Sequence, residues 1–287
     1  MNLVHDLERR AAEGPDRIGL IHEDGRTFRY AEIDAKVSRL GRAMAELGVN
    51  AGDPVALYIN NGPELVFCLF AAWKIGAVPV TLSALYGGDE LARSLAKVSA
   101  AALICDRPGF ENASAAAGNL VLAVIGANGA NVDIGDAADL DALAAGQQAG
   151  LTAPDLPGDS DAVILFTGGT TGEPKAVAMT HGGTFETMSR LARASKAGRS
   201  GPYPLAPETT PPNLVPLPLF HSGGQQAMMF AFHVGRSVLL MEKFSAPRMA
   251  ELVAQYRVDN LFLLPTMLYD LAYLVGEPDL SSVRSVL

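Results

Sequence analysis

Residues 165–181 read LFTGGTTGEPKAVAMTH and form the densest group of potential ligand-binding residues in the chain. A connecting loop needs one or two glycines for positive φ angles, whereas this one has three glycines, three threonines and a lysine. Glycines leave successive backbone N–H groups open to an anion, threonines add hydroxyl donors, and lysine adds a mobile positive charge. The segment therefore predicts a polyphosphate-binding loop between two strands, formed by Thr167, Gly168, Gly169, Thr170, Thr171, Gly172 and Lys175.

Two familiar phosphate-binding patterns do not fit this spacing. A Walker loop requires glycine five residues after Gly168, where Glu173 stands, and Ser or Thr after the lysine, where Ala176 stands. A dinucleotide fingerprint requires G-x-G, but Gly168 and Gly169 are adjacent. The remaining alternative without a ligand is a polar hairpin connection between two strands.

Composition narrows the class of protein. The 287 residues carry a net charge of −9, with 31 acidic against 22 basic residues, which excludes a strongly basic nucleic-acid surface. Cys68 and Cys105 each lie in an apolar stretch and are expected to be buried thiols, and the five histidines show no metal-ligand spacing. No signal peptide pattern is present and the apolar runs are too short for a membrane span, so a cytoplasmic location is expected.

The elements that position this loop alternate between strands and helices. Residues 17–30 read as two strands joined at Asp24-Gly25, and residues 30–49 as a helix with one apolar stripe ended by Gly48. Continuous apolar strands such as PVALYIN, AVPVTL, AALICD and DAVILFT alternate with helices, which predicts an α/β fold with mostly parallel sheets flanked by helices. We expect two β/α subdomains, residues 1–125 and 161–287, joined by a connecting segment over 126–160. Residues 198–213 are rich in proline and predict a mobile surface segment.

The ordered motifs resemble the adenylate-forming acyl-CoA synthetases, which include luciferases and peptide-synthetase adenylation domains. Their phosphate loop commonly reads T-S-G-T-T-G-x-P-K-G, and here it reads TGGTTGEPKA. FRYAEID, AAWKIGAVPVTL, GGDELARSL, PLFHSGGQ and LFLLPTMLYDL resemble further family segments in the expected order. Gly168 replaces the usual serine, which removes a hydroxyl worth about 1 kcal/mol of hydrogen bonding, and Ala176 replaces the usual glycine.

This resemblance implies a reaction and further site residues. ATP and a carboxylic acid, a fatty acid by expectation, would form an acyl-adenylate, and coenzyme A would then displace AMP in an acid-thiol ligase of fatty acid metabolism. Lys175 and His221 would be catalytic, with His221 beside the reacting carboxylate, and Gly224, Met228 and Met229 would line the acyl pocket. At helical spacing the two methionines could equally be ordinary core. His181 follows a strand and is expected to cap the next helix.

The resemblance also implies that part of a complete enzyme follows Leu287. Adenine recognition, the magnesium-binding glutamate and the small C-terminal lid domain come later in the family, so no metal ligand is assigned and the chain is expected to be an inactive N-terminal fragment. Its expected partners are a small carboxylic acid, ATP and coenzyme A, with a homodimer possible. The alternatives are an adenylating enzyme that loads a carrier protein, or a catalytically dead nucleotide- or acyl-binding protein.

Overall fold

The computed structural model describes all residues except 127–132, 168–174, 195–202, 275, 277 and 287. The chain forms two compact units, each assembled from an N-terminal stretch and a later one. Unit 1 comprises Met1–Glu8 and Glu32–Phe185, and unit 2 comprises Arg9–Ala31 and Glu186–Leu287.

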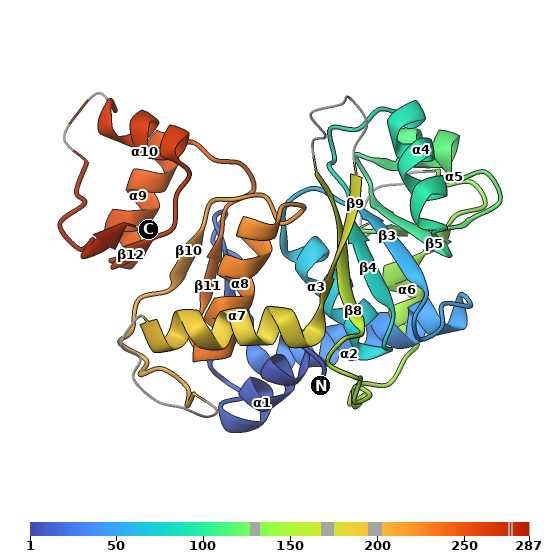
Figure 1. The fold of residues 1–287 in the computed structure, drawn as a ribbon, viewed down its shortest axis with the longest axis horizontal. Coiled ribbons are helices and arrows are strands. Elements are labelled where there is room, and N and C mark those ends of the chain that lie inside the picture. Colours follow the sequence, from blue (N-terminus) through green and yellow to red (C-terminus); the bar gives the residue numbers. More distant parts are fainter. Residues whose placement is uncertain (127–132, 168–174, 195–202, 275, 277, 287) are drawn as a thin grey trace. The chain divides into compact units, whose positions relative to one another are not determined.

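Unit 1 is built on a seven-stranded sheet (Figure 1). In spatial order the strands are β7 (Ala138–Asp139), β6 (Val121–Ile125), β5 (Ala102–Asp106), β3 (Pro54–Tyr58), β4 (Val78–Thr81), β8 (Asp161–Thr167) and β9 (Lys175–Thr180). Neighbouring strands are parallel except for β8 and β9, which form an antiparallel pair at one edge. The carboxyl ends of β3, β4, β5, β6 and β8 therefore share one edge of the sheet, where α/β proteins bind their ligands.

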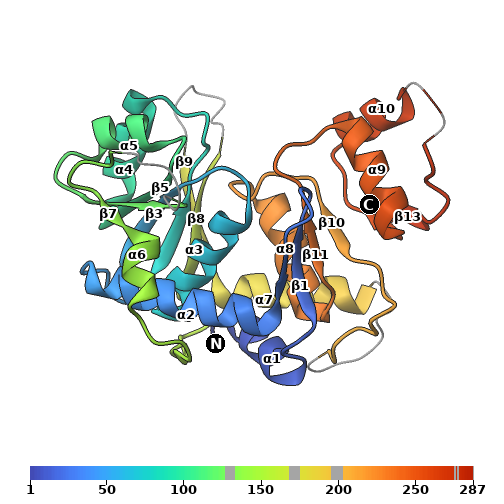
Figure 2. The ribbon, with the colours of Figure 1, turned by 180° about the vertical axis from the view of Figure 1, so that it is seen from behind.

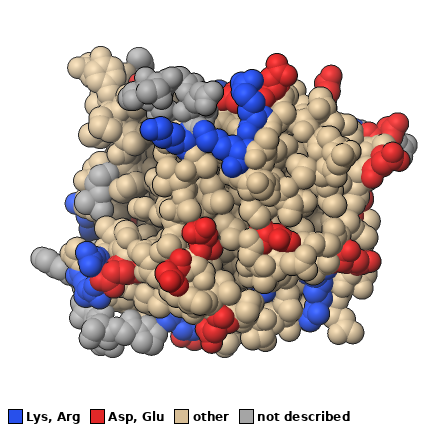
Figure 3. Space-filling model, turned by 45° about the vertical axis from the view of Figure 1, so that its right-hand side comes forward, with Lys and Arg blue, Asp and Glu red and all other residues tan. Residues whose placement is uncertain are grey.

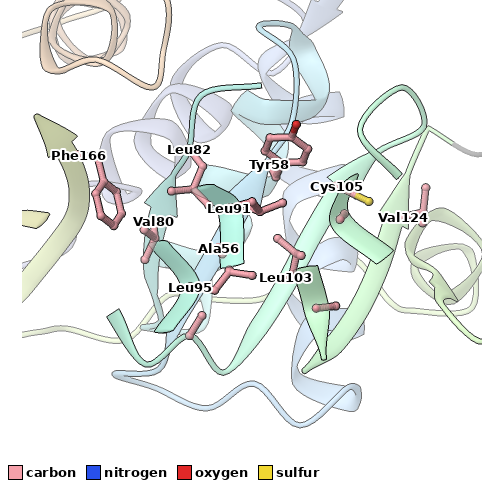
Figure 4. Packing of buried hydrophobic residues seen from close by; sticks show 13 residues of the cluster. Ala56, Tyr58, Val80, Leu82, Leu91, Leu95, Leu103, Cys105, Val124 and Phe166 are labelled. Carbon is pink, nitrogen blue, oxygen red and sulfur yellow. The ribbon is translucent and has the colours of Figure 1, made fainter. Parts of the chain in front are cut away.

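Helices cover both faces of this sheet because its strands are apolar on both sides. Helices α4 (Gly88–Val98) and α5 (Phe110–Ala117) cover one face, where Leu91 and Leu95 pack over Ala56, Val80 and Leu103 (Figure 4). Helices α2 (Tyr30–Glu46), α3 (Pro63–Lys74) and α6 (Leu140–Ala145) lie on the other side, seen from behind in Figure 2. The sheet thus forms the middle layer of three, as the continuous apolar strands predicted.

The apolar stripe predicted for the long amphipathic helix α2 is confirmed. Ile33, Val37, Leu40 and Met44 are fully buried, and the helix ends just before Gly48, whose φ of +93° suits a residue without a side chain. Cys68 and Cys105 are both free and buried, as expected, and burial raises the pKa of each thiol, that of Cys105 to about 12.

Unit 2 contains a four-stranded sheet in the order β10 (Asn213–Val215), β11 (Val238–Leu240), β1 (Ile18–His22) and β2 (Thr27–Arg29). The hairpin β1–β2 turns at Gly25 with a φ of +96°, as the Asp24-Gly25 pair predicted. Helix α9 (Ala246–Tyr256) packs Met249, Leu252 and Val253 against one face of this sheet. The unit also contains the strand pair β12 (Asn260–Leu261) and β13 (Ser285–Val286) and helices α8 (Ser222–Val234) and α10 (Pro265–Ala272). Three helices span the boundary between the units: α1 (His5–Glu13), α2 and α7 (His181–Ala194).

The compact units differ from the subdomain boundaries expected from sequence. Strands β8 and β9 belong to unit 1 because β8 pairs in parallel with β4, with Val80 opposite Ile164. The first hairpin belongs to unit 2 because β1 pairs in parallel with β11, with Leu20 opposite Val238. Residues 1–125 and 161–287 therefore do not coincide with the two units, since strand pairing over long sequence separations decides membership.

The segments expected to be a connection (126–160) and a mobile surface segment (198–213) both include residues held by regular structure or tertiary contacts. The connection 126–160 includes β7, which joins the sheet beside β6, and α6, whose first turn is capped by the Asp139 carboxylate accepting from the Ala142 N–H at 2.9 Å. In the proline-rich segment, Tyr203 is buried and its carbonyl accepts a hydrogen bond from Arg10, whereas Pro204 and residues 207–209 are exposed. Tertiary contacts therefore fix part of each segment.

The surface mixes charges of both signs. Figure 3 shows acidic side chains as small separate groups on one face, with the basic side chains gathered mainly near its upper edge and a largely uncharged surface between them. Within the described part of the chain, no helix combines the length and the apolar character that crossing a membrane requires.

Candidate functional site

The predicted phosphate loop connects the two antiparallel strands of unit 1. Strand β8 ends at Thr167 and β9 begins at Lys175, and these two residues are directly paired across the hairpin. The Thr167 hydroxyl lies 3.5 Å from the Lys175 carbonyl oxygen. Residues Gly168, Gly169, Thr170, Thr171 and Gly172 lie outside the described residues, so the structure locates the loop by its two ends, at the carboxyl edge of the parallel sheet.

Lys175 is exposed and makes no hydrogen bond or ion pair through its side chain with any residue that the structure describes. An ammonium group without a carboxylate partner keeps its full charge available to an anion. The geometry is therefore compatible with the phosphate-binding role that the sequence predicts.

Other polar residues at this edge are engaged in holding the scaffold. The Asp106 carboxylate accepts from the Asn60 and Gly109 N–H groups at 2.7 and 2.9 Å, and the Tyr58 hydroxyl donates to the Tyr86 carbonyl at 2.6 Å. A cradle of this kind holds the loops that follow β3, β4 and β5 at fixed positions. We assign Asp106 and Tyr58 to the scaffold rather than to ligand binding.

The second predicted group begins at the N-terminus of α8 in unit 2. His221 is the N-cap residue of α8, with extended φ and ψ of −107° and 149°, and its ring lies 4.3 Å from that of Phe220, measured between centroids. Partial desolvation lowers the pKa of His221 below its ordinary value of 6.5. The imidazole is therefore neutral at pH 7, so it can exchange hydrogen bonds with a carboxylate without forming an ion pair.

Gly224 allows α8 to lie against the preceding loop. A Cβ atom there would lie 2.7 Å from the Leu217 carbonyl oxygen and would also collide with that of Pro218. The buried Gln225 fastens the same loop, because its side-chain Nε2 donates to the Leu219 carbonyl at 2.7 Å. Gln225 escaped the sequence analysis, although a polar residue within an otherwise apolar helix was a usable signal.

Met228 and Met229 are both buried, at 0% and 5% exposure, and so have the burial of core side chains. The predicted residues thus form two groups, Thr167 and Lys175 in unit 1 and the α8 residues in unit 2. Within each group the structure brings the predicted residues together; the two groups belong to different compact units.

His181 has a structural contact, but it is not the helix cap that we expected. Its ring is fully buried beside Trp73, and Nδ1 accepts the backbone N–H of Leu3 at 3.2 Å. Burial, reinforced by the positive N-terminus, lowers the pKa of His181 from 6.5 to about 4. The neutral ring therefore holds the N-terminal stretch within unit 1.

We predict that this histidine makes stability depend on pH. The unfolded chain protonates His181 near pH 6.5 and the folded chain only near pH 4, so the contribution is complete above 6.5 and is lost as pH falls to 4. The expected loss is about 2–3 kcal/mol over this range, measured by urea unfolding. His181→Asn keeps an acceptor for Leu3 without titrating, and its stability should change less over the same range. Equal pH dependence in both proteins would contradict the prediction.

Comparisons with known proteins agree with these observations. The family model described as "AMP-binding enzyme" matches residues 7–287. The chain is 30% identical over 277 residues to a crotonobetaine/carnitine–CoA ligase of Salmonella paratyphi C, covering 92% of this chain and 51% of that protein. It is 28% identical over 291 residues to 4-coumarate–CoA ligase 5 of Oryza sativa subsp. japonica, covering 99% of this chain and 52% of that protein. The chain spans about half the length of these curated relatives.

A solved structure has the same fold. The inhibitor-bound N-terminal domain of FACL13 from Mycobacterium tuberculosis superposes with a TM-score of 0.83 at 24% identity, covering 99% of this chain and 69% of that one. This similarity concerns the fold, since the identity is low.

Proposed function

Because the chain belongs to the AMP-binding enzyme family, we propose that it is the N-terminal part of an ATP-dependent acid–CoA ligase. The proposed reaction joins a carboxylic acid to AMP and then transfers the acyl group to coenzyme A. The observation that carries the proposal is the TGGTTGEPK segment, placed between β8 and β9 at the carboxyl edge of a parallel sheet, with Lys175 unpaired among the described residues.

The first step needs positioning and charge stabilisation more than proton transfer. A carboxylate oxygen attacks the α-phosphorus of ATP, forming the acyl phosphate bond while the bond to the departing pyrophosphate breaks. Since a carboxylic acid is already ionised at neutral pH, no general base is required. We propose that Lys175 and the N–H and hydroxyl groups of Thr167–Gly172 stabilise the charge on the pyrophosphate.

The second step replaces the acyl phosphate bond of the adenylate by a thioester bond to coenzyme A. The thiolate of coenzyme A attacks the acyl carbon and AMP leaves as the acyl phosphate bond breaks. We propose that His221 lies beside this reacting carboxyl group and that Gly224, Met228 and Met229 border the acyl chain. The lowered pKa of His221 supports this role, because a neutral imidazole can donate one hydrogen bond without retaining a carboxylate as an ion pair.

The kind of acid, the metal ion, the cellular location and the oligomeric state are further parts of the same proposal. Curated relatives are named for crotonobetaine, carnitine and 4-coumarate, so a fatty acid is one candidate among several acids. Mg²⁺ is included because divalent cations neutralise the phosphates in such transfers, and no residue of this chain is assigned as its ligand. A cytoplasmic location and a homodimer also stand as proposals.

We predict that Lys175→Met weakens ATP binding by about 10–100-fold, the amount expected for one charged hydrogen bond to a phosphate. Isothermal titration calorimetry on a form that continues past Leu287, where adenine recognition is expected, measures the effect. Lys175→Arg should recover part of the affinity, and Lys243→Met, an exposed lysine of the other unit, should change nothing. Equal affinity of Lys175→Met and the parent would remove Lys175 from the site.

ATP–pyrophosphate exchange tests the proposed reaction itself. We would measure exchange driven by a panel of aryl, short-chain and fatty acids, in this chain and in a longer form that continues past Leu287. Acid-dependent exchange that disappears with Thr170→Ala and Thr171→Ala supports the ligase and names its acid. ATP binding without exchange in either form would contradict the ligase and favour a nucleotide-binding protein. Transfer to free coenzyme A, rather than to a carrier protein, separates the two ligase types.

A further inference from the structure

One imidazole and two carboxylates meet in unit 2 at the ends of strands β1 and β11. A ring nitrogen of His22 and one carboxylate oxygen each from Glu23 and Glu242 lie within 4.8 Å of one another. His22 is the last residue of β1, and Glu242 follows the end of β11 by two residues. Strands β1 and β11 are parallel neighbours with His22 opposite Leu240, so the segments that follow them leave the sheet at the same edge (Figure 2).

The histidine carries an unused ligand atom. His22 is 3% exposed, and its Nε2 is buried without a hydrogen-bond partner among the residues that the structure describes. Buried polar nitrogens nearly always have a partner in folded proteins, so this atom requires an explanation. A bound cation would provide one.

Asp24 holds the imidazole in the form that can bind a metal. The Asp24 Oδ2 lies 2.9 Å from the His22 Nδ1, and the same carboxylate is fixed by Arg26, whose Nε donates to it at 2.7 Å. Arg26 Nη2 also lies 3.4 Å from Nδ1, but the Asp24 oxygen is nearer, so we assign the ring proton to Nδ1 and the lone pair to Nε2. Metal-binding histidines are typically oriented by a carboxylate in this way.

The two glutamates supply oxygen ligands of different mobility. Glu23 is fixed, since its Oε1 accepts the backbone N–H of Glu242 at 2.6 Å, and its Oε2 lies 3.8 Å from the Arg248 Nε. The exposed Glu242 carboxylate has no hydrogen bond or ion pair with another described residue and can move toward a cation. The nearby Arg248 charge lowers the affinity but leaves the site net negative.

We propose that His22, Glu23 and Glu242 bind a first-row divalent cation of the Zn²⁺ class, with Asp24 as the positioning residue for His22. One imidazole nitrogen with two carboxylate oxygens is a ligand set suited to such cations, with water in the remaining positions. The cation would link the β1–β2 hairpin to the end of β11, two segments more than 200 residues apart in sequence.

Titration of the chelator-treated chain with ZnCl₂ tests the proposal, with Co²⁺ absorption as a second probe of the ligands. We expect one Zn²⁺ per chain, about 100-fold weaker binding in His22→Gln, and about 10-fold weaker binding in Asp24→Asn. Zn²⁺ should also raise the Tm of the parent protein and not that of His22→Gln. His5→Gln, a histidine of α1 outside the cluster, is the matched control and should bind as the parent does.

Glu242→Gln changes an exposed side chain and keeps the test valid if His22→Gln does not fold. It should weaken binding at least 10-fold while circular dichroism stays unchanged. Absence of one-to-one binding below millimolar Zn²⁺, or equal affinity in Glu242→Gln and the parent, would overturn the proposal. Because the readout is metal binding rather than nucleotide turnover, its outcome is independent of the ligase proposal.

Discussion

Replacing Arg10 by methionine is expected to lower the free energy of unfolding by about 4–6 kcal/mol, because a buried charged donor is lost from several acceptors at once. The fully buried guanidinium donates to the Phe232 carbonyl at 2.9 Å, to the Tyr203 carbonyl at 2.7 Å and to the His233 carbonyl. Phe232 and His233 lie in the last turn of α8, where the Phe232 carbonyl also accepts the backbone N–H of the C-cap residue Gly235 at 3.2 Å. Methionine fills a similar volume but donates nothing to them.

Urea unfolding of Arg10→Met, Arg10→Lys and Arg193→Met would measure this effect. Lysine retains the charge but lacks the planar fork that reaches three carbonyls and the Glu13 carboxylate, so Arg10→Lys should lose about half as much stability as Arg10→Met. Arg193 is a half-exposed arginine of α7, and its replacement should change stability by less than about 0.5 kcal/mol. A loss below 1 kcal/mol in Arg10→Met would show that water or other donors replace the guanidinium.

Replacing Lys74 by methionine is expected to cost about 3–5 kcal/mol, since it leaves two carboxylates without their shared cation. The ammonium is 1% exposed and lies 2.6 Å from the Glu8 carboxylate and 2.7 Å from that of Asp34. Glu8 also accepts the backbone N–H of Ala153 at 2.9 Å, so the network joins four stretches of unit 1, those around Glu8, Asp34, Lys74 and Ala153. Thermal and urea unfolding of the variant would measure the loss.

A combined variant tests whether the loss comes from the stranded carboxylates. Adding Glu8→Gln and Asp34→Asn to Lys74→Met removes the unpaired charges, and should recover at least half of the lost stability. Lys243→Met, at an exposed lysine, should stay within about 0.5 kcal/mol of the parent. If the combined variant were as unstable as Lys74→Met alone, packing around the lysine stem would be the dominant factor.

Local patterns in the sequence identified most of the elements correctly. The stripe of Ile33, Val37, Leu40 and Met44, the turn at Gly25 and the strands on either side of the glycine-rich segment all occur as predicted. Each depends on residues a few positions apart, through helical periodicity, turn geometry or a run of apolar side chains. The same local information identified the phosphate-loop pattern and the family.

Two elements of unit 1 were missed. Helix α5 is rich in alanine and has no strong apolar period, whereas β6 reads VLAVI, a continuous apolar run like those of the identified strands, and was overlooked. Their burial comes from neighbours, since Ala113, Ala117 and Val124 belong to the cluster formed with α4 and the sheet. Tertiary packing, rather than propensity, determines such elements.

By itself the sequence determined the order of most strands and helices, the α/β class and the hairpin turn, and it predicted the residues of the candidate phosphate loop. Only the tertiary structure decided that β8 pairs with β4 and β1 with β11, and therefore which residues share a unit. It also decided that Arg10 and Lys74 are buried donors and that His22 and Glu242 meet. The physical reason is that periodicity and turn chemistry act over a few residues, whereas strand pairing and burial of a charge depend on segments brought together from distant parts of the chain.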